Sequence, residues 1–168
     1  PERLDAHFIS SFGKEVWLAM QFIPFQRGEQ WHLLQLMTDI WDQVHAAARL
    51  QLQSTALDAA ANTIVITDAQ GRIEWVNPAF TKSTGYTAEE AIGQNPRILK
   101  SGRHPREFYE GMWKIILAGH VWHGELHNLR KNGSPLEEEA TITPVKDSSG
   151  HITHFIAIKQ DITERKSL

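Results

Sequence analysis

Three long strand-like segments near the end of the chain, separated by short turns, constrain its fold more than any other feature. Residues 121–130, 136–145 and 152–160 are rich in apolar and β-branched side chains. The turns between them, at residues 131–133 and 147–150, consist largely of the Asn, Asp, Ser and Gly that tight reversals favour. Strands joined by connections this short pair antiparallel. We therefore expect a three-stranded meander that buries one face against other elements.

The residues before this meander supply two further strands and the helices that would cover it. Residues 63–67 and 72–76 are predicted to form a hairpin. Helix signals fill residues 77–119, where Asn77 has the position of an N-cap and Thr87 with Glu90 has the spacing of a capping box. The longest predicted helix places four apolar side chains on one face: Phe108, Met112, Ile115 and Ile116. A five-stranded antiparallel sheet with helices inserted between its second and third strands is an α+β fold, with a ligand pocket expected between the layers.

Residues 1–40 repeat a pattern found at the end of the chain. Residues 22–40 and 142–162 each contain a proline, a turn, an apolar strand and then an aspartate; Asp39 and Asp161 lie 122 positions apart (161 − 39). This is about one small domain and too long for a solenoid repeat. We interpret residues 1–40 as the last strands of a preceding, truncated domain of the same kind. Two unrelated hairpins with a common pattern are the alternative.

The segment between the two parts is predicted to be a connecting helix. Residues 41–61 contain no Gly or Pro and are rich in Ala, Leu and Gln. Their narrow apolar stripe suits a dimer seam or docking onto the next sheet. The helix would lead into a domain at residues 62–162, and residues 163–168 would begin an exit helix. Because an isolated hairpin is marginal in water, we expect the strands of residues 1–40 to pair with another chain or to pack on the connecting helix.

Composition and motifs weigh against several classes of function. The chain has no cysteine, which excludes disulfides, thiolate metal sites and cysteine nucleophiles and fits a reducing, cytoplasmic location. The net charge is −3 with both signs interspersed, so nucleic-acid binding has little support. Apolar runs are far shorter than a membrane span of ~20 residues, and we expect no membrane contact by this fragment. Without a nucleophile elbow or a phosphate loop, no catalytic residue is predicted and the chain is not expected to be an enzyme.

A series of short motifs resembles the PAS sensor domains. Each motif is common by itself, but their order and spacing over residues 56–166 are specific. They lie at residues 66–73, 76–80, 84–86, 89–93, 95–102, 122–125, 128–133 and 160–165. The chain resembles most the PAS domains of bacterial histidine kinases and diguanylate cyclases. Among these it is similar to the FAD-binding redox sensors of nitrogen-fixation and methane-monooxygenase regulation.

This resemblance implies a flavin, FAD rather than FMN, with Asn95, Trp122, Asn128 and Glu138 as cofactor-binding residues. Trp122 stands in a Trp-x-Gly-Glu context like that of the flavin redox sensors, and Asn128 shares its strand face. In light-sensing flavin PAS domains the residue that matches Asn128 hydrogen-bonds the ring edge. The alternative is that Trp122 packs in the core and Asn128 caps the following turn.

Three positions argue against light-sensing flavin chemistry. The reactive cysteine of that subfamily would fall at Pro96, its second ring-binding asparagine at Glu138 and its switching glutamine at Lys159. A flavin here would therefore report redox state. Glu138 is still expected to face the pocket, where a buried carboxylate would need Lys159, Arg97 or the ligand as a partner.

Haem and a metal ion are the other ligands considered. Haem PAS sensors take their axial histidine from the long helix, which here contains none, leaving only His104 and His120 beside it. One possible set of metal ligands alternates onto a single strand face: His123, Glu125 and His127. Residues i and i+4 of a strand lie ~13 Å apart, too far to share an ion, so a solvated polar face is expected.

The end of the domain is predicted to carry the signal. Asp161 and Thr163 stand where the last strand meets the exit helix, and either can cap that helix. The resemblance implies that this junction transmits a shift of the sheet, within a homodimer, to a C-terminal histidine kinase or diguanylate cyclase. The sequence thus predicts a sensor of redox state or oxygen. The alternative is a ligand-free PAS module for dimerisation and signal relay.

Overall fold

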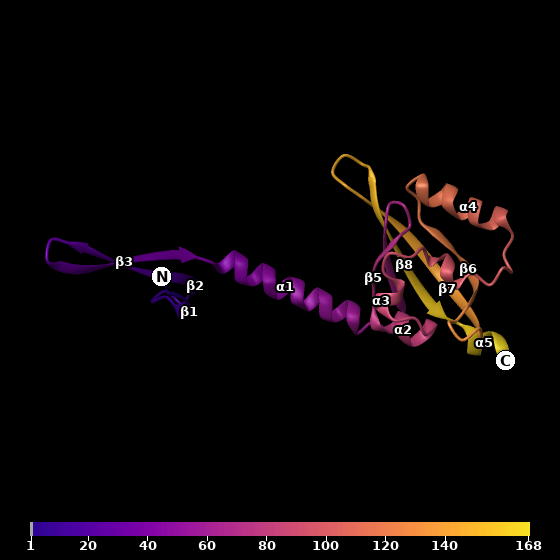
Figure 1. Cartoon of the computed structure of the whole chain (residues 1–168), viewed down its shortest axis with the longest axis horizontal. Coiled ribbons are helices and arrows are strands. Elements are labelled where there is room, and N and C mark those ends of the chain that lie inside the picture. Colours follow the sequence, from indigo (N-terminus) through magenta and orange to yellow (C-terminus); the bar gives the residue numbers. More distant parts are fainter. Residues whose placement is uncertain (1) are drawn as a thin grey trace. The chain divides into compact units, whose positions relative to one another are not determined.

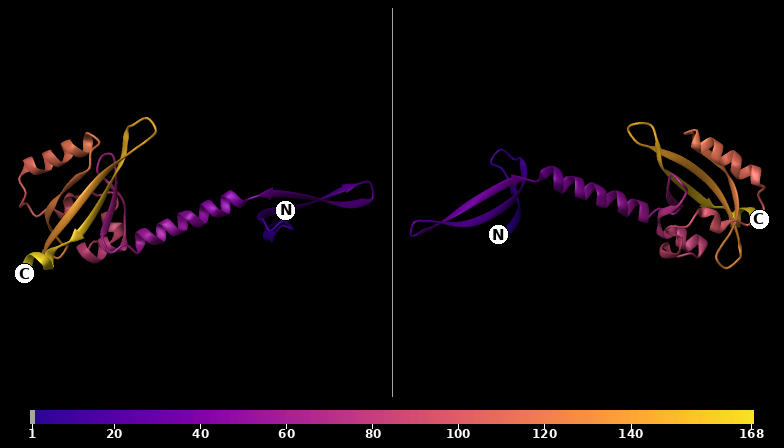
Figure 2. Two further views of the ribbon diagram at one scale, coloured as in Figure 1. Left: turned by 180° about the vertical axis from the view of Figure 1, so that it is seen from behind. Right: turned by 45° about the horizontal axis from the view of Figure 1, so that its top comes forward.

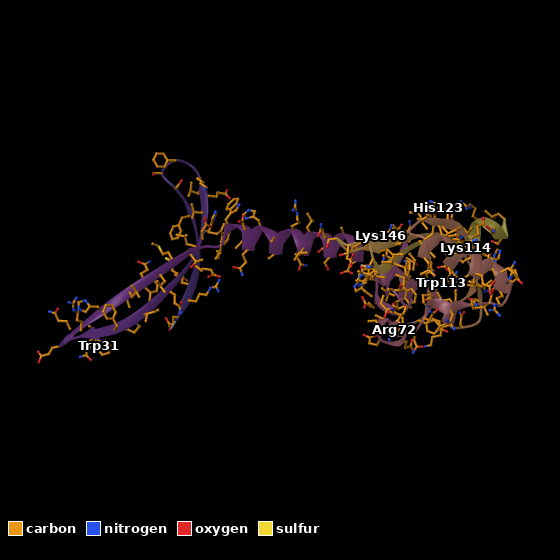
Figure 3. All side chains as sticks on the ribbon, turned by 90° about the horizontal axis from the view of Figure 1, so that it is seen from above. Trp31, Arg72, Trp113, Lys114, His123 and Lys146 are labelled. Atoms are coloured by element: carbon orange, nitrogen blue, oxygen red, sulfur yellow. The ribbon has the colours of Figure 1, made fainter. Side chains whose placement is uncertain are left out.

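The computed structural model describes residues 2–168, and it divides into two units after Ser54. In the first unit, strands β1 (Arg3–Ile9), β2 (Glu15–Arg27) and β3 (Gln30–Asp39) form an antiparallel sheet in the order β1-β2-β3 (Figure 1). Most of its side chains are exposed, and on β3 they project into open space, as Trp31 does in Figure 3. Helix α1 (Trp41–Asp58) follows, three residues shorter than predicted at its end.

The second unit is built on a five-stranded antiparallel sheet. Its strands are β4 (Thr63–Asp68), β5 (Ile73–Val76), β6 (Trp122–Leu129), β7 (Pro135–Lys146) and β8 (Ile152–Asp161). They lie in the order β5-β4-β8-β7-β6, so the meander β6-β7-β8 meets the first hairpin through the pair β4 and β8. The predicted α+β fold, with helices inserted between the second and third strands, is confirmed.

The inserted segment contains α2 (Pro78–Thr84), α3 (Ala88–Ala91), the 3₁₀ helix η1 (Pro96–Leu99) and α4 (Arg106–Leu117). Both predicted helix starts are present. Asn77 Oδ1 accepts from Phe80 N at 3.2 Å, and Thr87 and Glu90 form a capping box. Asn77 Oδ1 also accepts from Ile64 N of β4 at 2.9 Å, which ties the start of α2 to the sheet. α4 lies against β6 and β7 (Figure 2), and α5 (Thr163–Ser167) follows β8.

The apolar core of this unit has two parts. One gathers under α2, α3 and η1, around Phe80, which is fully buried. The other gathers between α4 and the strands β6, β7 and β8, around Trp122 and Phe155. Helices that cover one sheet face at two places leave space between the two parts of the core, and a cavity opens there. None of the helices described over residues 2–168 has the length and apolar character that crossing a membrane requires.

Candidate functional site

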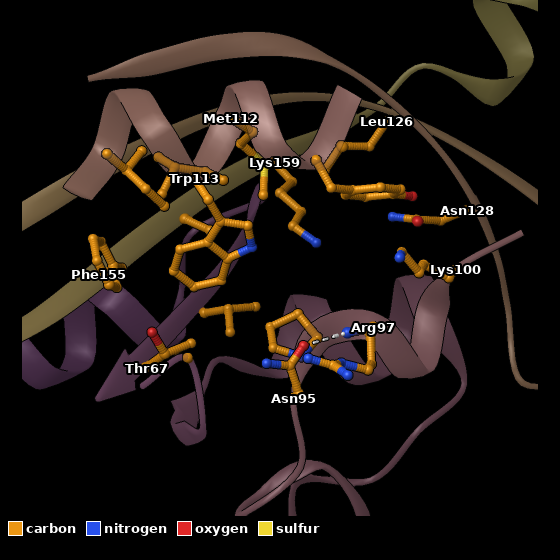
Figure 4. A pocket seen from close by; sticks show the side chains of 17 residues that line it. Thr67, Asn95, Arg97, Lys100, Met112, Trp113, Leu126, Asn128, Phe155 and Lys159 are labelled. Atoms are coloured by element: carbon orange, nitrogen blue, oxygen red, sulfur yellow. Dashed lines mark hydrogen bonds between the residues drawn. The ribbon is translucent and has the colours of Figure 1, made fainter. Parts of the chain in front are cut away.

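The cavity lies between the helical segment and the inner face of the sheet and has a volume of about 250 Å³. Its walls are mostly apolar and come from β4, α4, β6 and β8; they include Val65, Met112, Trp113, Ile116, Leu126 and Phe155 (Figure 4). Polar and charged side chains line the rest. Such a combination of apolar walls and a few converging polar groups is typical of a small-molecule site.

Trp113 of α4 holds its indole in the middle of the cavity (Figure 4). The ring packs edge-on against Phe155, with the centroids 5.6 Å apart. It also approaches Gly71, where a Cβ atom would lie 3.0 Å from the indole. Because Gly71 has a φ of +80°, the left-handed region that favours glycine, the turn between β4 and β5 can bring its backbone this close to the ring. A flat apolar surface is thus held ready inside the cavity.

Three buried polar residues, which we call the polar triad, stand on the strands at the cavity: Asn128 of β6, Glu138 of β7 and Lys159 of β8. Glu138 Oε2 accepts from Asn128 Nδ2 at 2.8 Å and lies 3.5 Å from Lys159 Nζ. The residues Glu138 and Lys159 are 1% and 4% exposed. Asn128 and Lys159 line the cavity, whereas Glu138, which was predicted to face it, is not among the lining residues and bonds both of them instead. Of the partners expected for Glu138, Lys159 is therefore present.

Two polar atoms of this region are buried without a hydrogen-bond partner among residues 2–168: Glu138 Oε1 and the hydroxyl of Tyr109. Tyr109 lines the cavity from α4, and burial raises the pKa of its hydroxyl. The Lys100 ammonium lies 3.8 Å from the centroid of its ring, within cation–π range. Because a buried polar group without a partner is costly, the Tyr109 hydroxyl marks a place where a ligand atom would be stabilised.

The cofactor-binding residues predicted from the sequence are only partly brought together. Asn95 and Asn128 both line the cavity, and Asn95 Oδ1 also accepts from Arg97 N at 3.0 Å, which caps η1. Trp122 shares the strand face of Asn128 as expected, but it is not among the cavity-lining residues. Its ring packs edge-on against Phe108, 5.8 Å between centroids, inside the apolar core. The core-packing alternative describes its position.

The three residues considered as metal ligands on β6 bind three different partners. His123 Nδ1 is 2.8 Å from Thr141 Oγ1, Glu125 is paired with Lys166 of α5, and His127 Nδ1 is bonded to the Glu137 carboxylate. Each side chain is thereby engaged by a partner of its own.

The bond of His127 to Glu137 belongs to a compact group that we call the histidine cluster: Arg103, His104, His127 and Glu137. Arg103 Nη1 donates to Glu137 Oε1 at 2.6 Å, and His104 Nε2 accepts from the backbone N–H of His127 at 2.9 Å. The two imidazole rings are stacked 4.7 Å apart, and Phe108 covers the other side of His104 at 3.8 Å. Burial raises the pKa of Glu137, but the hydrogen bond and charge of His127, together with Arg103, hold that pKa below its usual range.

Stability is expected to fall as the pH drops through about 6.5, because His104 must stay neutral to accept this hydrogen bond. Burial, followed by the charges of His127 and Arg103, lowers the pKa of His104. The unfolded chain therefore takes up the proton first, so the contribution of His104 is complete above its unfolded pKa and is lost below it. Urea unfolding at pH 7.5 and pH 5.5 measures the difference. The His104→Gln variant should show a smaller pH effect, whereas the exposed His120→Gln control should match the wild type; equal pH effects in all three would contradict the assignment.

The predicted output junction is tightly bonded. Asp161 Oδ1 accepts from the backbone N–H and the hydroxyl of Thr163, at 2.9 and 2.6 Å, and Asp161 Oδ2 accepts from Arg130 Nη2 at 2.9 Å. Burial raises the pKa of Asp161, but these bonds hold it below its usual range. The backbone of Glu137 completes the junction, because its N–H donates to Thr163 Oγ1 and its carbonyl accepts from Ile162. Glu137 thus joins the histidine cluster to the start of α5.

Comparison with known proteins decides the family. The PAS domain family matches residues 61–164, which is more than half of the chain and includes the cavity and the output junction. The chain belongs to the PAS domain family.

Individual relatives agree with this assignment. The nitrogen fixation regulatory protein of Klebsiella oxytoca is 38% identical over 109 residues, which are 65% of this chain and 22% of that protein. The bacterioopsin transcriptional activator of Halobacterium salinarum is 30% identical over 118 residues, 68% of this chain and 18% of the activator. The chain thus spans about a fifth of the length of these curated relatives. The resemblance to PAS domains and to nitrogen-fixation regulators is confirmed.

Solved structures show the same PAS fold. A PAS domain from Colwellia psychrerythraea is 30% identical, with a TM-score of 0.61, covering 70% of this chain and 99% of that one. An RNA-binding light-oxygen-voltage receptor has a TM-score of 0.67 at 24% identity, over 88% of this chain and 39% of the receptor, and it supports the fold alone.

Some cavity residues of the PAS domain were not predicted from the sequence. The expected inner face of α4 included Ile115, which is 39% exposed, whereas Tyr109 and Trp113 turn inward. Their spacing with Ile116 (i, i+4, i+7) is itself an apolar helix stripe and could have revealed them. Lys100 follows η1 and carries no such signal.

Proposed function

We propose that the PAS domain binds a flavin in its cavity, FAD rather than FMN, and senses redox state or oxygen. The observation that carries the proposal is the cavity itself, in which the Trp113 indole faces the same space as Asn128 and Lys159 of the polar triad. A flavin ring needs a flat apolar slot and hydrogen-bonding groups at its edge. Trp113 supplies the first, and Asn128 with Lys159 supplies the second.

The size and charge of the cavity suit the ring system rather than the whole dinucleotide. A volume of about 250 Å³ lies just below the usual range of small-molecule sites. The phosphates of FAD would need positive charge at the opening, and the exposed residues Arg97 and Lys100 provide it among the lining residues. A bound flavin would supply reversible electron transfer, while these residues would bind it, orient it and exclude water.

The residues of the cavity also favour redox sensing over the other ligand chemistries considered. With no cysteine in the sequence, a flavin–cysteine bond cannot form, and Pro96 lines the cavity where the resemblance places that cysteine. None of the described lining residues is a histidine, and His104 is stacked between Phe108 and His127. Haem therefore has no axial histidine among the described lining residues and is not proposed.

The signal is proposed to leave through β7. Glu138 belongs to the polar triad, and the preceding residue, Glu137, bonds the start of α5 through its backbone. A ligand that changes the position of Asn128 or Lys159 would move Glu138, and with it the backbone of Glu137. The bonds of Glu137 with Ile162 and Thr163 would carry that movement into α5. Because β7 is bonded to the start of α5 through the backbone of one residue, Glu137, a small shift of β7 would be sufficient to move α5.

Partners are proposed from the same arrangement. A homodimer formed through the connecting helix, with a histidine kinase or diguanylate cyclase beyond α5, would turn this movement into an output. The similarity to a protein named a nitrogen fixation regulatory protein supports a regulatory role. A ligand-free relay module is the second candidate, because Trp113 already occupies part of the cavity.

Purified protein is expected to show flavin absorbance, or to acquire it after incubation with FAD and removal of the excess. Chromatography of the released cofactor distinguishes FAD from FMN, and reversible bleaching by dithionite tests the redox cycle. A protein that stays colourless after incubation with FAD would remove the flavin and leave the relay module.

A further inference from the structure

The first sheet repeats the strand register of the PAS sheet. Leu4 of β1 lies opposite Met20 of β2, and Gly124 of β6 lies opposite Ala140 of β7. Both residues of the first pair are 120 positions before those of the second (124 − 4 and 140 − 20). The register is shared along the whole pair of strands, since both ladders are continuous and antiparallel.

The second hairpin of each sheet matches as well. Leu18 pairs with Asp39 between β2 and β3, and Glu138 pairs with Asp161 between β7 and β8. The offset is again 120 on the first strand (138 − 18) and 122 on the second (161 − 39). The two additional residues lie between Val145 and His154, where a register shift in the ladder precedes the longer turn before β8.

The exits from the two sheets have the same hydrogen bonds. Asp39 Oδ1 and Asp161 Oδ1 each accept from the backbone N–H two positions later, at 2.9 Å in both cases. The backbone N–H of Ile40 donates to the neighbouring strand at 2.9 Å, and that of Ile162 does so at 2.8 Å. Two unrelated hairpins would share a sequence pattern without sharing register, cap and exit bond together.

The offsets identify which face of the first sheet corresponds to the cavity face of the PAS domain. That face is apolar and open; its residues include Leu4, Phe8, Leu18, Met20, Leu33 and Met37. Leu33 is 62% and Met37 61% exposed. In the PAS domain the equivalent face is covered by α4, and the outer edge of β8 is paired with β4. The first sheet has no such cover or partner strand among residues 2–168.

We propose that residues 3–40 are the closing half of a second PAS-type domain, and that a preceding segment of the same chain completes it. This segment supplies a strand that pairs with the free edge of β3, as β4 pairs with β8, and a helix that covers the apolar face, as α4 does. Residues 63–117 perform these tasks in the PAS domain. The same physical reason applies to the first sheet and to the sheet of the PAS domain. An unpaired strand edge and an exposed apolar face both favour association with further elements.

The second domain would not share the ligand chemistry of the first. Its positions equivalent to the polar triad are Phe8, Leu18 and Met37, so each polar group is replaced by an apolar side chain. A domain with this interior holds a filled apolar core or an apolar ligand at that place. This consequence does not depend on whether the PAS domain binds flavin.

Hydrogen exchange on the native chain with its own upstream residues, compared with the 168-residue chain, tests the proposal. The backbone amides at the free edge of β3 are expected to exchange at least about tenfold more slowly in the longer chain. Equal exchange in the two chains overturns the proposal. A second result also overturns the proposal. If the protection of β3 in the 168-residue chain rises with protein concentration, and the upstream residues do not increase it, then a second copy of the chain pairs with β3.

Two lysine substitutions on β3 of the longer chain provide a matched pair. Leu33→Lys, on the apolar face, is expected to lower the unfolding midpoint of the upstream domain and to remove the β3 protection. Thr38→Lys, on the opposite face of the same strand, should leave both unchanged. If Leu33→Lys prevents folding, Leu33→Ala gives the smaller change in the same direction. Equal effects of the substitutions at Leu33 and Thr38 overturn the assignment of the covered face.

Discussion

The Lys159→Met variant is expected to lower the free energy of unfolding of the PAS domain by about 3–5 kcal/mol. Lys159 Nζ lies 3.5 Å from Glu138 Oε2, and the two side chains are 5% and 1% exposed. Removing the ammonium leaves a buried carboxylate whose one remaining hydrogen bond comes from Asn128, at 2.8 Å. An unpaired charge at such a depth costs far more than the packing that the methionine retains. Urea unfolding followed by circular dichroism measures the loss.

The double variant Glu138→Leu, Lys159→Met should recover most of this loss, because replacing both members of a buried pair by apolar residues is often neutral or stabilising. A matched control lies one residue away on β7. Glu139 pairs with Arg165 at 3.7 Å, but these side chains are 57% and 63% exposed, so Arg165→Met should cost less than about 1 kcal/mol. A Lys159→Met variant as stable as the Arg165→Met variant would contradict the buried pair.

The order of the elements could be predicted because their boundaries depend on local chemistry. Asn77 caps α2, and Thr87 with Glu90 caps α3, as their types and spacing indicated. The turns before β7 and β8 contain the glycines Gly133 and Gly150 with positive φ. Each of these signals needs only a few neighbouring residues, so a single sequence is sufficient to locate it.

The cavity could be predicted only in part, because it depends on how the layers meet. Period-two alternation placed Trp122 and Asn128 on one face of β6 correctly. It does not say how far along the strand α4 lies, and α4 brings Phe108 against Trp122, which excludes that ring from the cavity. On α4 itself two neighbouring apolar stripes both turn inward, so that Met112 and Ile116 line the cavity together with Tyr109 and Trp113, and only Ile115 of the predicted face is exposed.

The polar triad, too, could be predicted only in part from the sequence. Glu138 and Lys159 could be suggested as partners because a buried carboxylate needs a cation. Their contact with Asn128 depends on the register of β6 and β7, in which Asn128 lies opposite Leu136 and diagonal to Glu138. The turn that sets this register would have to be known to within one residue. Sequence patterns thus suggest the chemistry, while the pairing of strands decides which groups meet.

Substitutions of Trp122 and Trp113 distinguish between two places for the flavin ring. The sequence motif predicted that the ring contacts Trp122, whereas in the structure Trp113 is the tryptophan that lines the cavity. If a flavin ring packs on the indole in the cavity, Trp113→Ala should weaken FAD binding about 10- to 100-fold, the equivalent of about 1–3 kcal/mol of stacking. Trp122→Phe keeps an aromatic ring against Phe108 and should leave the affinity within a few-fold of the wild type. Titration of the apoprotein with FAD measures both dissociation constants.

Trp75 of β5 provides the control for the general effect of removing an indole from the domain. It belongs to the same domain as Trp113 but is not among the cavity-lining residues. Trp75→Ala should therefore bind FAD as the wild type does. A large loss in Trp122→Phe with none in Trp113→Ala would place the ring beside the core, as the sequence motif suggested. Tighter binding by Trp113→Ala would show instead that its indole fills the space a ligand needs, because removing it enlarges the cavity between α4 and β8. The sign of this one change thus distinguishes a stacking surface from an obstruction.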